Sequence, residues 1–294
     1  MFYRRKIILV LIQLFDWKVD KIRLQKLLFL FTQRQIKAEY DFIPYRFGCY
    51  SFSANADLLT MVKKGMLTEN ENHFVYNEPK DYFNDLKETD KKIMLEIKSL
   101  YNKMNAAALM KHTYLNFPYW ATNSIKASEI LSLGQLQKVE ESKPKISETI
   151  LFTIGYEGIS LEGYLNKLII NDIKILVDVR NNPLSMKYGF SKSQLIRFCN
   201  NVGIDYLHFP EVGIQSVLRQ ELNNQNDYDQ LFEDYCESNL KKTTNSQLKI
   251  LDLLINNKRI ALTCFEANIC QCHRKHLAEA IENLSNYKYQ VKHI

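Results

Sequence analysis

Polar and charged residues follow four apolar segments in the C-terminal half, at the point where each predicted strand ends. The strands are predicted at residues 150–155, 173–180, 204–210 and 259–266. The residues behind them are Gly155-Tyr156-Glu157, Asp178-Val179-Arg180-Asn181, Pro210-Glu211 and Cys264-Phe265-Glu266, with Cys272-His273-Arg274 a few residues on. Because ligands bind beyond the carboxyl ends of the strands in an open parallel sheet, we expect these side chains to converge on one crevice.

Three carboxylates of this set, Glu157, Asp178 and Glu266, are candidates for acid–base catalysis. Carboxylates in such a crevice act as a general base or stabilise a cationic, sugar-like transition state. The alternative is structural, because a buried carboxylate costs several kcal/mol unless it is paired with a cation. Asp178 would then form an ion pair with Arg180 or Arg274.

Cys264 is the fourth catalytic candidate, because it lies in a predicted strand whose following loop runs into a helix near residue 273. A nearby helix N-terminus and Arg274 would lower the pKa of this thiol and favour the thiolate. The helix N–H groups, with Arg180 and Arg274, would also receive a phosphate or another anion. The residues predicted to bind the substrate are Tyr156, Arg180, Asn181, Lys192, Glu211, Cys272, His273 and Arg274.

Six cysteines are present, and three of them, at positions 264, 270 and 272, crowd into nine residues. In a chain of this length such clustering favours chemistry or a metal over disulfide bonds. Zinc could be held by these three cysteines together with His273 or His276. The spacing C-x₅-C-x-C-H, however, does not match the paired cysteines of structural zinc sites, so the sequence predicts neither a metal nor a cofactor.

Predicted helices must connect these strands and position the residues that follow them. The helices are predicted at 161–172, 192–203, roughly 227–257 and 273–284, and a terminal strand follows. Continuous apolar strands separated by helices are typical of a mainly parallel sheet with helices on both faces. We therefore predict an α/β domain over residues 149–294.

The N-terminal half follows a different plan. Apolar periodicity predicts helices at 3–15, 20–36 and roughly 53–64. Two short strands around an Asn/Glu turn are predicted after Gly65. Three helices and a two-stranded wing are the plan of a winged helix-turn-helix, which we predict over residues 1–80. Residues 81–138 are predicted to form a helical connector, and residues 139–148 have the composition of a linker.

The positive charge of the chain lies in its N-terminal half. Residues 1–145 hold 23 Lys and Arg against 16 Asp and Glu, whereas the remaining residues hold 16 against 17. A localised positive face is the electrostatic footprint of a polyanion, although a solvated lysine-rich surface has the same composition. We predict double-stranded DNA as the partner. The predicted contacts are Arg23, Lys26, Arg34, Arg46, Lys63 and Lys64.

The apolar start of the chain, MFYRRKIILVLIQLF, is predicted to be a first helix and not a signal peptide. Asp16 and Lys18 follow it directly, and no small-residue cleavage site is present. No apolar run reaches the roughly 18–20 residues that cross a bilayer. The sequence therefore predicts a cytoplasmic protein with no membrane partner.

Two groups of motifs resemble known families. The segments LQKLLFLF, FIPYRFGCYS and LLTMVKKGML resemble winged-helix domains of the Panacea and YwgA type, with Cys49 where their turn usually has proline. Such domains often bind DNA or contact other proteins. The segments IGYEG, VDVRNNPLSMKYGFSK, GIDYLHFPEVG and CFEANICQCHR resemble the family catalogued as domain of unknown function 488. That resemblance implies an α/β fold with this crevice and assigns no activity.

Three functions are compatible with these features. The first is a bacterial defence-type enzyme that hydrolyses a nucleic acid or nucleotide, with N-glycosidic cleavage of modified DNA favoured among its reactions. The second is cysteine chemistry on a small substrate, either sulfur transfer or dephosphorylation. It rests on the analogy with rhodanese-like domains, which also place Asp-Val-Arg after a strand and a cysteine loop before a helix. The third is a non-enzymatic sensor of modified bases or nucleotides.

Overall fold

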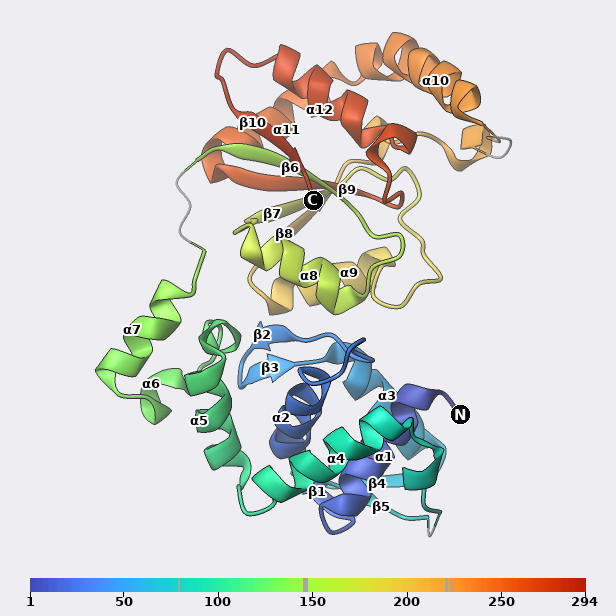
Figure 1. Cartoon of the computed structure of the whole chain (residues 1–294). Helices are drawn as coiled ribbons and strands as arrows, with labels where there is room; N and C mark the ends of the chain where they lie inside the picture. The colour runs from blue at the N-terminus through green and yellow to red at the C-terminus, as the bar shows by residue number, and fades with distance from the viewer. Residues whose placement is uncertain (79, 145–147, 220–221, 223) are drawn as a thin grey trace. The chain divides into compact units, whose positions relative to one another are not determined.

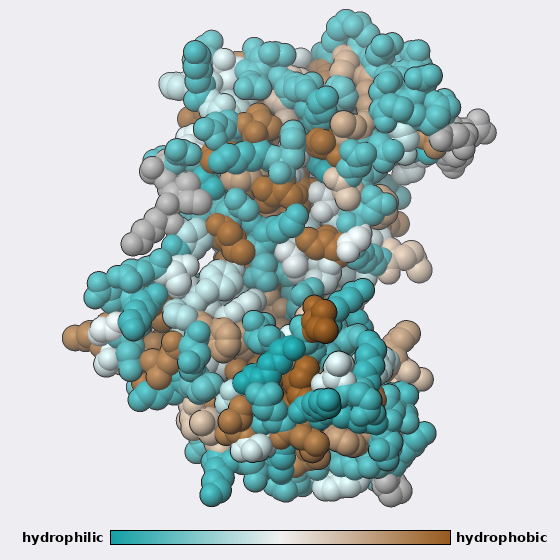
Figure 2. Space-filling view, in the orientation of Figure 1, coloured by the Kyte–Doolittle hydropathy of each residue, from teal (hydrophilic) through white to brown (hydrophobic). Residues whose placement is uncertain are grey.

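The chain divides into two compact units, Met1–Lys143 and Pro144–Ile294 (Figure 1). The computed structural model describes residues 1–78, 80–144, 148–219, 222 and 224–294. Within these residues, no helix is long and apolar enough to cross a membrane. Figure 2 shows a face on which hydrophilic residues predominate and apolar residues are scattered in small groups.

A five-stranded parallel sheet forms the centre of the C-terminal unit. Its strands are β6 (Ile150–Gly155), β7 (Ile175–Asp178), β8 (Asp205–His208), β9 (Arg259–Cys264) and β10 (Gln290–His293), in the order β10-β6-β9-β7-β8. The predicted α/β class with a parallel sheet is thereby confirmed. Because all five strands run the same way, their carboxyl ends share one edge, where Cys264 lies opposite Gly155.

Helices cover both faces of this sheet (Figure 1). They are α8 (Leu161–Ile170), α9 (Lys192–Asn201), α10 (Gln225–Asp234), α11 (Thr244–Asn257) and α12 (Arg274–Asn283). Strand side chains alternate between the two faces. Leu262 packs in one core with residues of α11 and α12, whereas the hydroxyl of its neighbour Thr263 accepts a hydrogen bond from Tyr164 of α8 at 2.7 Å. The continuous apolar strands are therefore explained by burial on both sides.

The helical section predicted at 227–257 is divided into three elements. A π-helical turn, Tyr235–Leu240, separates α10 from α11, and α11 begins only at Thr244. The hydroxyl of Tyr235 donates to the carbonyl oxygen of Val212 at 2.7 Å. This turn therefore fastens the segment after β8 to the helices.

The N-terminal unit begins with helices and a small antiparallel sheet. Its first elements are α1 (Tyr3–Leu14), β1 (Lys18–Asp20), α2 (Lys21–Thr32), β2 (Ile43–Tyr45), β3 (Gly48–Tyr50), α3 (Phe52–Lys63), β4 (Leu67–Glu69) and β5 (His73–Tyr76). β1, β5 and β4 form one sheet, and β2 pairs with β3. Asp20 caps α2 by accepting from the backbone N–H groups of Ile22 and Arg23. The three predicted helices and the two strands after Gly65 are all present.

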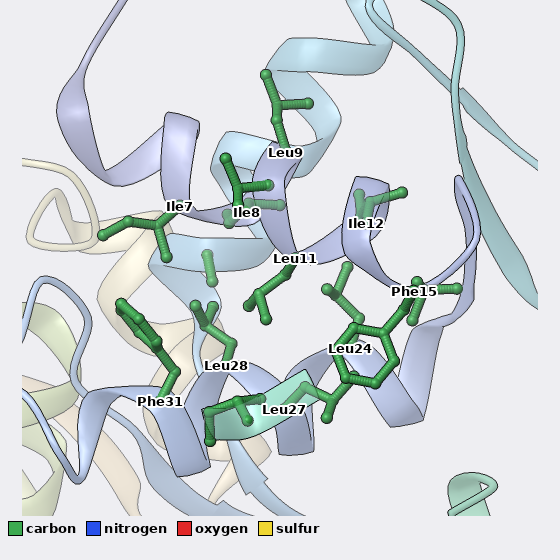
Figure 3. Close-up of a cluster of buried hydrophobic side chains, with 14 of the residues drawn as sticks. Ile7, Ile8, Leu9, Leu11, Ile12, Phe15, Leu24, Leu27, Leu28 and Phe31 are labelled. Carbon is green, nitrogen blue, oxygen red and sulfur yellow. The ribbon is translucent and has the colours of Figure 1, made fainter. Parts of the chain in front are cut away.

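Helix α1 is the centre of the N-terminal core. Its residues from Ile7 to Ile12 are fully buried. Figure 3 shows their side chains meeting those of α2, among them Leu24 and Leu28. Burial on all sides explains why this segment reads as apolar almost without interruption.

The predicted connector packs in the same core as the first helices. It contains α4 (Glu88–Tyr101), α5 (Ala106–Asn116), α6 (Ala127–Ile130) and α7 (Leu133–Glu141). Met94, Ile97 and Leu109 belong to the hydrophobic cluster built by α1 and α2. Helix α7 continues to Glu141, so the first residues of the predicted linker are helical, and residues 145–147 of that linker lie outside the described chain.

Candidate active site at the carboxyl edge of the parallel sheet

A pocket of about 340 Å³ lies at the carboxyl edge of the sheet, where the segments after β6, β7 and β9 meet. Six of the predicted site residues line it: Tyr156, Arg180, Asn181, Cys264, Glu266 and His273. Its volume is within the range of small-molecule sites. The predicted crevice is therefore present, with a smaller set of residues than expected.

Asp178 and Arg180 form a buried ion pair beside the pocket. The Asp178 carboxylate accepts from the Arg180 backbone N–H at 3.0 Å, from its Nε at 2.9 Å and from its Nη2, and from the hydroxyl of Tyr206 at 2.6 Å. Burial by itself would lower the pKa of Arg180, but the hydrogen bonds to Asp178 raise it above its ordinary value. Asp178 is fully buried and paired with Arg180, which is the arrangement of an internal counter-ion, and its catalytic role stays a prediction.

Arg180 is likewise occupied by protein groups. Its Nη1 donates to the hydroxyl of Tyr156 and to the carbonyl oxygen of Phe190, each at 2.9 Å. The guanidinium also lies over the Tyr156 ring, 5.1 Å from its centroid. Arg180 therefore holds the wall of the pocket, and its predicted binding of an anion stays a prediction.

Three other predicted residues take structural positions. Glu157 is exposed, and its Oε2 accepts from the backbone N–H of Ala267 at 3.0 Å. Glu211 accepts from Ser246 Oγ at 2.6 Å, and Lys192 Nζ lies 3.0 Å from His208 Nδ1. None of these side chains is among the described residues that line the pocket. Their predicted catalytic or binding roles therefore have no support in this geometry.

The backbone of Glu266 is fixed from two sides. A Cβ added at Gly155 would overlap the carbonyl oxygen of Glu266, so β6 needs glycine at its last position. The same oxygen accepts from Arg274 Nη1 at 2.6 Å. Arg274 is buried and also donates to Thr153 Oγ1, so it braces the loop, and it is not among the described residues that line the pocket.

Two cysteines and a histidine converge at the floor of the pocket. The sulfurs of Cys264 and Cys272 and the Nδ1 of His273 all lie within 4.8 Å of one another. Cys264 Sγ is 3.8 Å from His273 Nδ1, and Cys272 Sγ is 3.9 Å from it. All three residues are buried, and Cys272 is fully so. Cys270 is exposed, and His276 packs against Phe232, so neither belongs to this cluster.

Hydrogen bonds fix the tautomer of His273. Its Nε2 lies 3.1 Å from the carbonyl oxygen of Val179, which can only accept. Its Nδ1 lies 2.8 Å from Nη2 of Arg219, which can only donate. These contacts place a proton on Nε2 and direct Nδ1 toward the cysteines and Arg219.

Arg219 completes the site, and the sequence patterns did not identify it. It ends a short 3₁₀ helix, Ser216–Arg219, in the segment between β8 and α10. Its Nη1 pairs with Glu266 Oε1, and its Nη2 donates to His273. The predicted site residues were mainly those that follow strands, and Arg219 does not directly follow one.

The Cys264 thiol lies between groups with opposite effects on its proton. The pKa of Cys264 is lowered, mainly by a hydrogen bond from Cys272. Burial acts in the opposite direction and raises this pKa, whereas His273 and Arg219 lower it further. Burial is the main cause of a raised Cys272 pKa. Cys264 Sγ also lies 3.1 Å from Glu266 Oε2, and a thiolate there would face a carboxylate with no proton between them. The proton therefore lies in the hydrogen bond that Cys264 Sγ donates to Glu266 Oε2.

The predicted DNA contacts divide into buried and exposed residues. Lys26 is buried and donates to the carbonyl oxygen of Cys49 at 2.8 Å, so its ammonium group lies inside the unit and not on the surface where DNA was expected. Arg23 donates to the carbonyl oxygen of Asn102, and Arg34 pairs with Glu96. Both side chains therefore have partners within the N-terminal unit. The remaining three, Arg46, Lys63 and Lys64, are exposed.

Comparison with known proteins places the C-terminal unit in relation to one family. Residues 160–281 match the family described as "Domain of unknown function DUF488". The match contains Asp178, Arg219 and the Cys264–His273 segment, and it confirms the resemblance of the C-terminal half. No curated protein and no solved structure matches the chain. The resemblance of the N-terminal part to Panacea and YwgA-type domains stays a prediction.

Proposed function

We propose that the chain is a hydrolase that acts on a nucleic acid or a nucleotide in the pocket around Glu266. The observation that carries this proposal is the position of Glu266, between the Cys264 thiol and the Arg219 guanidinium. A carboxylate held in this way can take a proton from water and return it to a leaving group. Among the described residues that line the pocket, it is the carboxylate available for this role.

The other lining residues suit a substrate with a planar base and an anionic group. Phe265 is 44% exposed, and its ring offers a face on which a base can stack. Asn181 and Asn182 add amide groups for hydrogen bonds with a base or sugar. Arg219 can receive a phosphate oxygen in the geometry that guanidinium groups favour.

Hydrolysis of a C–N bond is the reaction we propose, and glycosidic bonds in modified DNA are the first substrates to test. Water adds to the carbon, and the nitrogen leaves with the proton that Glu266 returns, so one water is consumed for each bond broken. A mechanism with two carboxylates is disfavoured, because Asp178 is paired with Arg180 and Glu157 lies outside the pocket.

We propose further that residues 1–80 form a winged helix that binds double-stranded DNA. The order α1, β1, α2, α3, β4, β5 and the antiparallel β1-β5-β4 sheet support this assignment. Arg46, Lys63 and Lys64 are the exposed cations proposed to contact phosphates. An enzyme that binds DNA and hydrolyses the glycosidic bond of a modified base would suit defence against foreign DNA.

A cysteine-dependent enzyme is the second candidate, with sulfur transfer or dephosphorylation as its reaction. Cys264 lines the pocket, and its sulfur is 3.8 Å from the lone pair of His273 Nδ1, a pairing that activates cysteine nucleophiles. This candidate requires Cys264 for turnover but not Cys272, which does not line the pocket. A sensor of modified bases, the third candidate, would bind the same ligands without any turnover.

The test is a panel of plain and modified DNA duplexes and free nucleotides, assayed for released base, ammonia and abasic sites. Wild type is compared with Glu266→Gln and with Glu157→Gln, a matched change at an exposed glutamate outside the pocket. We expect the Glu266 variant to lose at least about 100-fold in rate and the Glu157 variant to retain it. Turnover that survives in Glu266→Gln, or binding without product across the panel, would count against the proposal.

A further inference from the structure

Three metal-binding side chains meet at the floor of the proposed active site with nearly the separations that one ion requires. Zinc bonds are about 2.3 Å to sulfur and about 2.0 Å to nitrogen, so two such donors on a tetrahedral ion lie about 3.6 Å apart. The observed sulfur–nitrogen separations are 3.8 Å for Cys264 and 3.9 Å for Cys272, each measured to His273 Nδ1. The observed separations thus exceed the ideal value only slightly.

His273 already has the orientation of a metal ligand. Metal-bound histidines usually donate their second ring N–H to a carboxylate or a backbone carbonyl, which fixes the tautomer and the ring. His273 Nε2 donates to the carbonyl oxygen of Val179 at 3.1 Å, and the Nδ1 lone pair faces both sulfurs. Val179 directly follows β7, so the sheet itself positions this ligand.

The donor set identifies the kind of ion. Two thiolates and one imidazole favour Zn²⁺ and other thiophilic ions over Mg²⁺ or Ca²⁺, which prefer oxygen. Cys264 and His273 line the pocket, whereas Cys272 is fully buried behind them. Three protein ligands with the fourth position open to a pocket are the arrangement of catalytic zinc sites, in contrast to closed structural sites.

We propose that Cys264, Cys272 and His273 bind one Zn²⁺, with its fourth coordination position directed into the pocket beside Glu266. This inference rests on the proposed function, because it supplies the water for the hydrolysis proposed above. Zinc lowers the pKa of a bound water, so Glu266 can take its proton and leave a hydroxide for attack on the carbon. Glu266 then returns that proton to the departing nitrogen, and one water is consumed in all.

Arg219 has to move when the ion binds. Its Nη2 donates to the same Nδ1 lone pair that the ion would use, so arginine and zinc compete for His273. Arg219 also pairs with Glu266, and it would release that carboxylate as it leaves. A phosphate on the substrate provides a new partner for the freed guanidinium.

The test measures metal in the full chain by inductively coupled plasma mass spectrometry after expression with zinc. We expect about one zinc per chain in wild type and at least about a tenfold loss in Cys272→Ser and His273→Ala. Cys270→Ser is the matched control, because Cys270 is two residues from Cys272 but exposed and outside the cluster. If the variants misfold, Co²⁺ added to chelator-treated wild type should still give a thiolate-to-cobalt absorption band.

The outcomes separate the metal site from the proposed function. The proposed site would be overturned by wild type that holds no zinc and gives no cobalt band. It would also be overturned by equal zinc content in Cys272→Ser, or by a Cys264–Cys272 disulfide in place of the metal. Hydrolysis that persists after complete chelation would overturn the proposal that the ion supplies the attacking water. Stoichiometric zinc with no turnover on the substrate panel would leave the site standing and remove the hydrolase proposal alone.

Discussion

Cys264 Sγ lies 3.1 Å from Glu266 Oε2, although the two residues are separated by Phe265 and only one of them belongs to strand β9. The strand ends at Cys264, and the chain then turns so that Phe265 is exposed while the side chains on either side of it converge. A sulfur ligand and a carboxylate thus share one pocket floor.

Replacement of Arg219 by alanine should separate metal binding from catalysis. The change removes the donor that competes for His273 Nδ1, so we expect Arg219→Ala to bind Zn²⁺ at least as tightly as wild type. Its turnover should fall at least about tenfold, because the guanidinium proposed to bind the substrate phosphate is lost. Competition with a zinc-binding dye measures the affinity. Weaker zinc binding in Arg219→Ala would contradict the proposed competition between Arg219 and zinc for His273. Arg197→Ala, at an exposed arginine, is the control and should change neither the zinc affinity nor the turnover.

Loss of the Asp178 charge should destabilise the C-terminal unit. Asp178→Asn leaves Arg180 buried with its main partner weakened, and breaking a buried ion pair costs about 3–5 kcal/mol. Urea unfolding followed by circular dichroism measures the difference. Asp172→Asn is a suitable control, because that residue pairs with Lys174 near the surface and asparagine tolerates its positive φ of 51°. We expect the control to change stability by about 0–1 kcal/mol. Equal stability of both variants would show that the Asp178–Arg180 pair is dispensable.

Gly155→Ala should disturb the pocket through the backbone of Glu266. The added methyl group would overlap the Glu266 carbonyl oxygen, which cannot move freely because Arg274 donates to it. We expect a loss of about 1–3 kcal/mol in stability from overpacking, together with reduced turnover. Gly134→Ala, in helix α7 with open space around it, should be neutral or slightly stabilising. A fully active and stable Gly155→Ala protein would refute the proposed constraint.

DNA binding by the N-terminal unit should depend on exposed lysines and not on Lys26. We expect the double variant Lys63→Gln, Lys64→Gln to weaken duplex binding and to reduce the slope of log affinity against log salt by roughly 1–2. Lys26→Met, which alters a buried lysine, should leave that slope unchanged. Fluorescence anisotropy at several salt concentrations measures both. A duplex affinity that is insensitive to salt, or an equal loss in Lys26→Met, would argue against the proposed surface.

Local patterns in the sequence were sufficient for the C-terminal architecture. Apolar runs such as ILFTIG and RIALTC, separated by amphipathic segments, predict strands and helices, because burial on both faces requires a continuous apolar strand. Parallel pairing then brings the strand ends to one edge, so a crevice near Cys264 and Glu266 could be predicted without coordinates. The start of α9 at Lys192 agrees with the predicted one, and α2 begins at Lys21, one residue after the predicted start at Asp20, which caps it.

The roles of individual charged residues were decided by the tertiary structure. Asp178 and Glu266 both follow apolar strand residues, yet one is neutralised by Arg180 and the other faces the pocket. Lys26 was predicted to contact DNA, but packing directs it to the carbonyl of Cys49. A charge by itself does not specify its partner, because partners lie far apart in the chain and pair only when the fold is complete.

Arg219 and the Cys264–Cys272–His273 cluster show the same limit. Arg219 reaches Glu266 from a segment 47 positions earlier, and no periodicity marks it. The spacing of Cys264, Cys272 and His273 in the sequence matches no paired-cysteine motif. These residues meet because the loop between β9 and α12 folds back and brings Cys272 beside Cys264. The sequence by itself determined the sheet and the edge at which the residues gather. Only the path of the loops decided which of those residues share the site.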